Sequence, residues 1–131
     1  MNGHVLIVDD HAVIRHVLRE MFEREGLEVS DATNGAEGIQ KAQDVKPGLI
    51  ILDLSMPIMN GLEAARALRL FMPDVPLLMF TNNAAGIVER EARSAGISAV
   101  FCKSGSDAPR QLLAHVKVLL GVESARIQRA S

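Results

Sequence analysis

Short runs of apolar residues alternate along this chain with longer segments in which apolar residues recur every three or four positions. Continuous apolar runs are typical of parallel strands that helices cover on both faces. Recurrence at every third or fourth position is typical of helices that bury one face. The five runs that predict strands are His4–Val8, Val29–Ala32, Leu49–Leu52, Leu77–Phe80 and Ala99–Cys102.

A helix is expected after each of these runs, and glycine or proline follows most of the helical segments. Leu70 is expected to point inward near the end of the third helix, and Leu119 to belong to the buried face of the fifth. Asn82 or Asn83 is expected to cap the fourth helix. The positions that indicate these helices lie within residues 14–22, 36–42, 62–70, 84–95 and 107–120.

Strand–helix alternation with short connections predicts an α/β fold of the doubly wound type, with a parallel sheet and right-handed crossovers. The chain has 131 residues, which is enough for one domain. We assign residues 1–121 to this domain and residues 122–131 to a short C-terminal tail or the start of a linker.

Composition narrows the classes of function. The chain is 48% hydrophobic and 23% charged with a net charge of -2, which does not favour binding to nucleic acid or to an anionic membrane. Its aromatic residues are four phenylalanines, which argues against stacking on single-stranded nucleic acid. The single cysteine cannot form an internal disulfide, and no signal peptide or membrane-length apolar run is apparent. We therefore expect a soluble cytoplasmic protein.

Polar residues stand where the expected strands end. Asp9 and Asp10 follow the first strand, Asp53 the third, Thr81 the fourth and Lys103 the fifth. The carboxyl ends of parallel strands lie along one edge, where ligand sites form in open α/β sheets. The sequence therefore predicts that carboxylates, a hydroxyl and an amine converge at this edge.

A cluster of carboxylates needs a cation, because two like charges about 4 Å apart repel by roughly 4 kcal/mol at an effective dielectric constant near 20. Oxygen ligands suit Mg²⁺, which also accepts phosphate oxygens, and a lysine adds a mobile positive charge. Taken alone, Asp9 and Asp10 would be interpreted as a turn and a helix cap. Because Asp53, Thr81 and Lys103 also stand at strand ends along the same edge, the five residues together favour a metal site suited to phosphoryl transfer.

These residues, in this order, resemble the receiver domain of bacterial two-component response regulators. The resemblance covers about residues 4–120, and it implies a flavodoxin-like sheet with strand order 2-1-3-4-5. The matching stretches are Val5-Leu6-Ile7-Val8-Asp9-Asp10, Leu52-Asp53-Leu54-Ser55-Met56-Pro57 with Asn60-Gly61, Phe80-Thr81, and Cys102-Lys103.

The resemblance implies a role for each matching residue. Asp53 would attack the phosphohistidine of a partner kinase and become an acyl phosphate, and Lys103 would pair with a phosphoryl oxygen. Asp10 and Asp53 would bind Mg²⁺ directly, Asp9 largely through water, and Ser55 through its backbone carbonyl. The chain is not expected to be an enzyme, because it would turn over no separate substrate.

The resemblance also implies a switch. Thr81 would turn inward to hydrogen-bond the phosphoryl group, and the movement would spread to the fourth helix, the fifth strand and the fifth helix. The family's switch aromatic is replaced by Val100, while Phe101 lies one residue nearer the lysine. Strand alternation predicts that Phe101 points away from the Val100 side. Asn82 and Asn83 flank the site and are expected to modulate the approach of water.

The implied partners are a sensor histidine kinase or a histidine phosphotransfer protein, and a downstream protein that binds the fourth helix, fifth strand and fifth helix. No membrane and no direct nucleic-acid contact is expected, and the chain is expected to be a monomer or a weak phosphorylation-dependent dimer. Two other interpretations stay open: the receiver part of a longer DNA-binding transcriptional regulator, and a pseudo-receiver that works without phosphorylation. A haloacid-dehalogenase-like phosphohydrolase fits poorly, because Leu54 and Ser55, not an aspartate, follow Asp53.

The four histidines are interpreted as solvated or partly buried side chains rather than as metal ligands. His11 and His16 are five residues apart on the expected first helix and do not share a face, and His4 and His115 have no evident partner. His11 adjoins the acidic pair, so its position is compatible with a modest role at the site. Cys102 is expected to be a small buried apolar residue.

Overall fold

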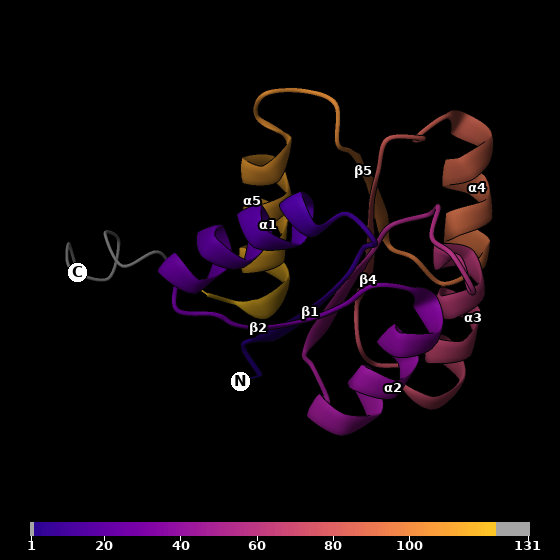
Figure 1. The fold of residues 1–131 in the computed structure, drawn as a ribbon, viewed down its shortest axis with the longest axis horizontal. Helices are drawn as coiled ribbons and strands as arrows, with labels where there is room; N and C mark the ends of the chain where they lie inside the picture. Colours follow the sequence, from indigo (N-terminus) through magenta and orange to yellow (C-terminus); the bar gives the residue numbers. More distant parts are fainter. Residues whose placement is uncertain (1, 123–131) are drawn as a thin grey trace.

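The computed structural model describes residues 2–122, and their fold is shown in Figure 1. Five parallel strands form one sheet in the order β2-β1-β3-β4-β5, which confirms the predicted fold class and strand order. The strands are β1 (His4–Val8), β2 (Glu28–Ala32), β3 (Leu49–Leu52), β4 (Leu77–Thr81) and β5 (Ala99–Cys102). The helices are α1 (Ala12–Arg24), α2 (Gly35–Val45), α3 (Gly61–Phe71), α4 (Gly86–Ser94) and α5 (Ala108–Leu120).

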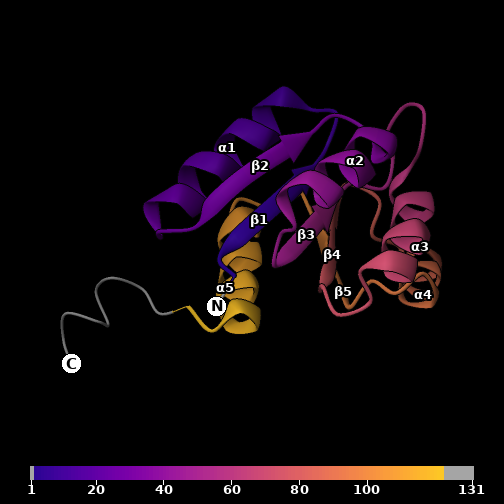
Figure 2. The ribbon, with the colours of Figure 1, turned by 90° about the horizontal axis from the view of Figure 1, so that it is seen from below.

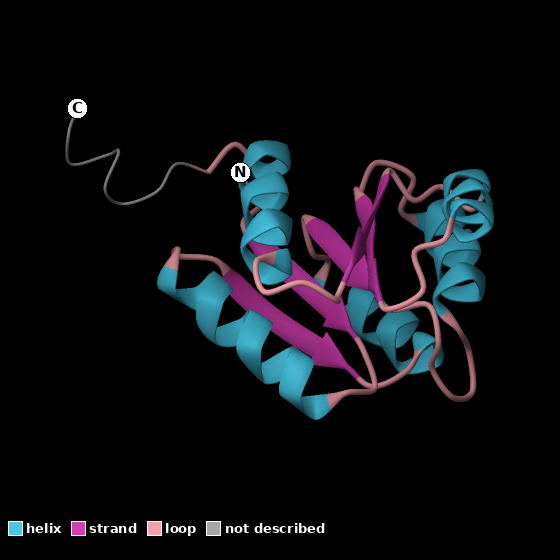
Figure 3. Ribbon diagram, turned by 90° about the horizontal axis from the view of Figure 1, so that it is seen from above, coloured by secondary structure: helices cyan, strands magenta, loops and turns pink. Residues whose placement is uncertain are grey.

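Helices cover both faces of the sheet, which explains why its strands are continuous apolar runs. In β1, Val5 and Ile7 pack in a cluster with α1 and α5, whereas Leu6 and Val8 pack in a cluster with α2, α3 and α4. The same alternation continues in β3 and β4, whose residues are all buried. Figures 1 and 2 show the two groups of helices on opposite sides of the sheet, and Figure 3 shows the strands running alongside one another between them.

Helix α5 ends at Leu120, and Gly121 follows it in a left-handed conformation. The domain end at residue 121 stays a prediction. Residues 123–131 of the predicted tail lie outside the described residues. Among residues 2–122, no helix is long and apolar enough to cross a membrane.

One face of the sheet is covered by α2, α3 and α4 (the α2–α4 side), and the other by α1 and α5 (the α1–α5 side). Side chains cap two helices on the α2–α4 side. Asn34 accepts a hydrogen bond from the backbone N–H of Glu37 at the start of α2, and Asn60 and Glu63 form a reciprocal capping box at the start of α3. The prediction that Asn82 or Asn83 caps α4 is wrong. The chain stays non-helical through residues 82–85, and the N-cap position falls on Ala85, which has no side chain to accept a hydrogen bond.

Two predicted core residues point to solvent instead. Leu70 is 86% exposed, because the buried stripe of α3 passes through Ala65 and Leu68 and two further residues turn the helix by about 200°. Leu119 is 40% exposed for a related reason, since the buried stripe of α5 ends on Leu120 rather than on its neighbour. In both helices, apolar residues extend around more of the helix surface than the sheet covers.

Gly61 holds the start of α3 against the strand end that carries Asp53. Its backbone N–H donates to the carbonyl of Leu54 at 2.9 Å, and an added Cβ would overlap the backbone carbonyl of Asp53. Only a residue without a side chain therefore permits this approach.

We expect Gly61→Ala to lower the free energy of unfolding by about 1–3 kcal/mol, the usual cost of overpacking. Gly86→Ala is the matched control, because Gly86 is also the first residue of a helix and its added Cβ would come no nearer than 3.9 Å to the Arg90 side chain. Urea denaturation followed by circular dichroism measures both. Equal stabilities for the two variants would refute the close approach.

Candidate phosphoryl-transfer site

The carboxyl ends of β1, β3 and β5 bring an acidic cluster and a lysine together, as the sequence predicts. Lys103 Nζ lies 2.6 Å from Asp9 Oδ2 and 3.3 Å from Asp53 Oδ2, so one ammonium group bridges carboxylates from two strands. The side chains of Asp9, Asp53 and Lys103 are 3–5% exposed. Asp10 stands at the mouth of the cluster, with its side chain 33% exposed.

Thr81 ends β4 beside this cluster and is buried. Its hydroxyl oxygen accepts a hydrogen bond from the backbone N–H of Asn83 at 3.3 Å. The backbone carbonyl of Thr81 accepts a second hydrogen bond, from the backbone N–H of Lys103 at 2.9 Å. The threonine therefore links the β4–α4 loop to the strand end that carries the lysine.

Burial raises the pKa of the Asp53 carboxyl above its ordinary value, and the neighbouring Asp9 carboxylate raises that pKa further. Lys103 and Thr81 act in the opposite direction by favouring the ionised form. One ammonium group thus offsets only part of the cost of burying two carboxylates, which leaves a site that favours a second cation.

Backbone contacts fix both buried aspartates. The N–H of Leu54 donates to Asp53 Oδ1 at 2.8 Å, and the N–H of His11 donates to Asp9 Oδ1 at 2.9 Å. Arg15, one turn into α1, donates through Nη1 to the backbone carbonyl of Asp9 at 2.8 Å. Sequence reasoning missed Arg15, whose only signal was its position one helical turn beyond the acidic pair.

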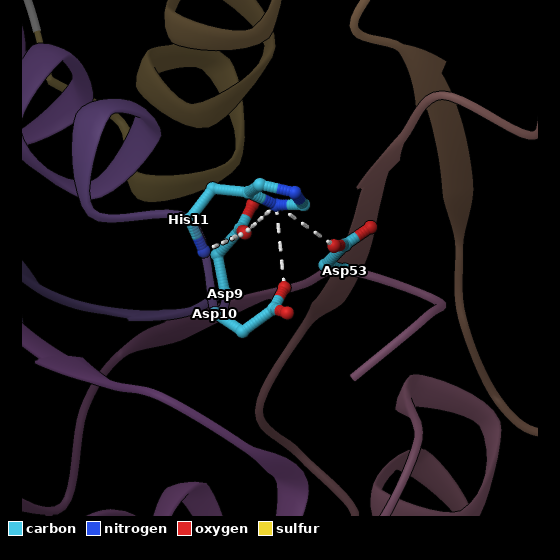
Figure 4. Close-up of side chains that lie close together, drawn as sticks. All are labelled: Asp9, Asp10, His11 and Asp53. Atoms are coloured by element: carbon cyan, nitrogen blue, oxygen red, sulfur yellow. Dashed lines mark hydrogen bonds and ion pairs between the residues drawn. The ribbon is translucent and has the colours of Figure 1, made fainter. Parts of the chain in front are cut away.

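His11 is closer to the cluster than the sequence indicates. It is the N-cap residue of α1 rather than a helical residue, so the comparison with His16 on a shared helix does not apply. Its Nδ1 lies 2.9 Å from Asp9 Oδ1, 3.2 Å from Asp10 Oδ1 and 3.8 Å from Asp53 Oδ2. Figure 4 shows the imidazole turned towards the three carboxylates.

The cluster has the composition and spacing of a site for a divalent cation. One ligand atom from each of Asp9, Asp10, His11 and Asp53 can be chosen so that all of them lie within 4.8 Å of one another. Three ionised carboxylates and one ammonium group leave two negative charges, which a divalent cation would neutralise. Carboxylate oxygens are the ligands that Mg²⁺ prefers, and they keep room for water and phosphate oxygens in its coordination sphere.

The remaining predicted site residues lie in the surrounding loops. Ser55 is an exposed residue two positions after Asp53, and its role as a carbonyl ligand stays a prediction. Asn82 and Asn83 are exposed in the β4–α4 loop. Val100 packs against the α2–α4 side and Phe101 against the α1–α5 side, so the predicted opposition of these two side chains is confirmed.

The other histidines have partners that the sequence did not reveal. His4 Nε2 is 2.7 Å from Ser30 Oγ across β1 and β2, and the ring of His115 meets Phe101 edge-on at 5.3 Å. Cys102 is only partly buried, because it ends the edge strand of the sheet. A hydrogen bond with Ser104, 2.9 Å away, lowers the pKa of the Cys102 thiol.

Comparison with known proteins decides the family. A family model described as the response regulator receiver domain matches residues 5–117, which span the strand ends and the acidic cluster. The chain belongs to the response regulator receiver family. The aspartates, the threonine and the lysine that converge at the edge of the sheet therefore all lie within the matched receiver domain.

Relatives of this receiver include both short and long proteins. It is 34% identical over 97 residues to the chemotaxis protein CheY of Thermotoga maritima, covering 73% of this chain and 81% of that protein. It is 36% identical over 108 residues to the transcriptional activator protein ExaE of Pseudomonas putida, covering 79% of this chain and 50% of that protein. The chain thus spans about half the length of several curated relatives that it matches.

Solved structures place the fold in the same family. The chemotaxis protein CheY4 of Vibrio cholerae superposes with a TM-score of 0.82 at 30% identity, covering 91% of this chain and 99% of that one. A CheY-like receiver from Methanospirillum hungatei superposes with a TM-score of 0.85 at 29% identity, covering 92% and 95%. The predicted flavodoxin-like receiver fold is therefore confirmed.

Proposed function

We propose that this receiver accepts a phosphoryl group on Asp53 from a phosphohistidine of a sensor kinase or of a histidine phosphotransfer protein. A carboxylate oxygen of Asp53 forms a bond to phosphorus, the phosphorus–nitrogen bond of the donor breaks, and the released imidazole takes up a proton. The observation that carries this proposal is the Lys103 ammonium group, which lies within 3.3 Å of carboxylates from β1 and β3.

Each neighbour of Asp53 has a part in this proposal. Lys103 is placed to pair with a phosphoryl oxygen once Asp53 has formed the acyl phosphate. Asp10 and Asp53 would hold Mg²⁺ directly and Asp9 largely through water, with the carbonyl of Ser55 as a further ligand. When bound, Mg²⁺ supplies charge neutralisation for the incoming phosphoryl group.

The proposed output is a change of surface over α4, β5 and α5, to which a downstream protein binds. Thr81 would turn its hydroxyl towards the phosphoryl group, breaking the 3.3 Å contact with the N–H of Asn83 and shifting the β4–α4 loop. Phe101 already packs with His115 on the α1–α5 side, and Val100 is too small to act as a swinging ring. We therefore propose that the signal leaves through this loop rather than through an aromatic side chain.

Two aspects of the proposal concern the whole protein. Several relatives are transcriptional regulators of about twice the matched length, which supports a receiver that controls a DNA-binding domain. A receiver that works without phosphorylation is less well supported, because Asp10, Asp53 and Lys103 are all present and close together. We place the protein in the cytoplasm, as a monomer or a weak phosphorylation-dependent dimer with no separate substrate to turn over.

The test is incubation with acetyl phosphate and Mg²⁺, followed by electrophoresis that retards phosphoproteins. We expect the wild-type chain and Asp74→Asn to gain one phosphoryl group, and Asp53→Asn to gain none. Asp74 is a suitable control because it is exposed in the loop between α3 and β4, outside the acidic cluster. Retardation of the Asp53→Asn variant, or of the wild-type chain in EDTA, would contradict the assignment.

Asn82 is expected to limit access to the phosphoryl group. It lines a hollow of about 420 Å³ together with His11 and Lys103, two residues that contact the acidic cluster. We expect Asn82→Ala to speed both phosphorylation by acetyl phosphate and loss of the phosphoryl group, because a smaller side chain admits both the donor and water. Release of radiolabelled phosphate measures the second rate directly. Unchanged or slower rates would contradict this crowding.

A further inference from the structure

The orientation of His11 bears on which cation the acidic cluster selects. A receiver site made of carboxylates alone presents only oxygen ligands, which favour Mg²⁺. In this chain an imidazole nitrogen lies among the carboxylate oxygens, 2.9 Å from Asp9 and 3.2 Å from Asp10 (Figure 4). Nitrogen is a ligand that first-row transition metal ions bind strongly and that Mg²⁺ rarely takes.

We propose that His11 is a metal ligand through Nδ1 and that it shifts the selectivity of this site from Mg²⁺ towards first-row transition metal ions. The proposal rests on the proposed function, because it concerns the same cation site beside Asp53. It adds a ligand and a metal preference that the aspartates alone do not supply.

Two of the three distances from His11 Nδ1 fit neighbouring ligands of one octahedral ion. With bonds of about 2.1 Å, neighbouring ligand atoms lie about 3.0 Å apart and opposite ones about 4.2 Å apart. Nδ1 of His11 lies at 2.9 Å and 3.2 Å from the oxygens of Asp9 and Asp10, and at 3.8 Å from that of Asp53. The imidazole thus stands at neighbouring-ligand spacing from the two carboxylates that follow β1, and its 3.8 Å distance to Asp53 falls between the two ideal spacings.

The position of His11 is fixed by local structure rather than by chance contact. As the N-cap residue of α1 it has extended backbone angles of -90° and 110°, which leave its N–H free to donate to Asp9 Oδ1. In this structure Nδ1 is hydrogen-bonded to Asp9 Oδ1 at 2.9 Å, and it carries the ring hydrogen there because a carboxylate oxygen only accepts. The side chain is 57% exposed, so a cation that replaces this hydrogen bond would leave the ring hydrogen on Nε2 and bind the lone pair of Nδ1.

The first experiment asks whether the nitrogen is bound. Mn²⁺ is added to the purified chain, and electron spin echo modulation detects any nitrogen-14 nucleus directly coordinated to the ion. We expect imidazole modulation in the wild-type chain and in His16→Gln, and none in His11→Gln. His16 is the matched control, because it is a 70% exposed histidine on α1 that pairs with Glu20, away from the cluster.

The second experiment measures selectivity by calorimetric titration with Co²⁺ and with Mg²⁺ at one fixed pH. We expect His11→Gln to lose about tenfold or more in Co²⁺ affinity, the usual scale for disturbing a ligand shell, and to lose much less in Mg²⁺ affinity. His16→Gln should match the wild-type chain for both ions.

The outcomes separate this inference from the function beneath it. Mn²⁺ that binds without nitrogen modulation, or equal losses of Co²⁺ and Mg²⁺ affinity in His11→Gln, would overturn the role of His11 and leave the phosphoacceptor assignment standing. A wild-type chain that binds none of these ions would overturn both the metal site and the inference.

Discussion

At pH 7 and without divalent cations, Asp53→Asn is expected to unfold at a higher temperature than the wild-type chain. The Asp53 carboxylate is buried and stands close to that of Asp9, and together these raise its pKa. Replacing the carboxylate with a neutral amide of the same shape removes both the burial of a charge and the repulsion between two carboxylates. We expect a gain of about 1 kcal/mol or more, roughly 3–5 °C for a domain of this size.

The pH dependence of this gain follows from the direction of the pKa shift. Folding raises the pKa of Asp53 above its ordinary value of 3.8, so the folded state holds the proton more tightly than the unfolded state does. Below the ordinary pKa both states are protonated and the carboxyl costs the fold little. As pH rises from the ordinary pKa through the folded pKa, the carboxyl ionises and the wild-type chain loses stability, whereas Asp53→Asn has no carboxyl there to ionise.

Differential scanning calorimetry at pH 4 and pH 7, with EDTA or with Mg²⁺, measures these effects. The advantage of Asp53→Asn should be larger at pH 7 than at pH 4 and should shrink when Mg²⁺ neutralises the wild-type cluster. Asp74→Asn, a change at an exposed carboxylate, should show neither trend. A lower melting temperature for Asp53→Asn at pH 7 would mean that its carboxylate stabilises the fold, contrary to this account.

Lys103→Met is expected to have the opposite effect on stability and to prevent phosphorylation. The lysine side chain is 5% exposed and is the cation within 3.3 Å of both buried carboxylates. Methionine keeps much of the volume of the stem but leaves these carboxylates without that partner. Breaking a buried ion pair by removing one member costs about 3–5 kcal/mol.

The loss of Lys103 also removes the positive charge proposed to meet the phosphoryl oxygens. We expect the rate of phosphorylation by acetyl phosphate to fall at least a hundredfold, in the range seen when one charge-stabilising group is deleted. Lys117→Met is the control, because Lys117 also forms a 2.6 Å ion pair, with Glu25, but links α1 to α5 away from the cluster. Comparable losses in the two variants would assign Lys103 a general structural role only.

Much of this architecture follows from patterns that the sequence carries locally. The strands could be predicted because burial on both faces demands unbroken apolar runs, and β1, β3 and β4 are buried almost throughout. The convergence of Asp9, Asp53 and Lys103 followed from topology, since parallel strands end at one edge of the sheet. These inferences needed no knowledge of side-chain conformation.

The features that sequence reasoning missed depend on where helices begin and how wide a buried face is. His11 looked like a helical residue, but the structure begins α1 at Ala12 and leaves His11 as its N-cap residue, with its ring turned towards the carboxylates. Leu70 and Leu119 were assigned to the core because apolar character does not reveal the angular width of a helix–sheet contact. Helix starts without a capping side chain, such as that at Ala85, carry no local signal.

The claim that Asp53 is the phosphoacceptor has one direct measurement. The chain is phosphorylated with acetyl phosphate and Mg²⁺ and then treated with borohydride, which reduces an acyl phosphate and converts the modified aspartate to homoserine. Peptide mass spectrometry then locates the converted residue. The account predicts homoserine at position 53 and at no other aspartate. Conversion at Asp9 or Asp10 instead, or phosphate that borohydride does not release, would contradict it.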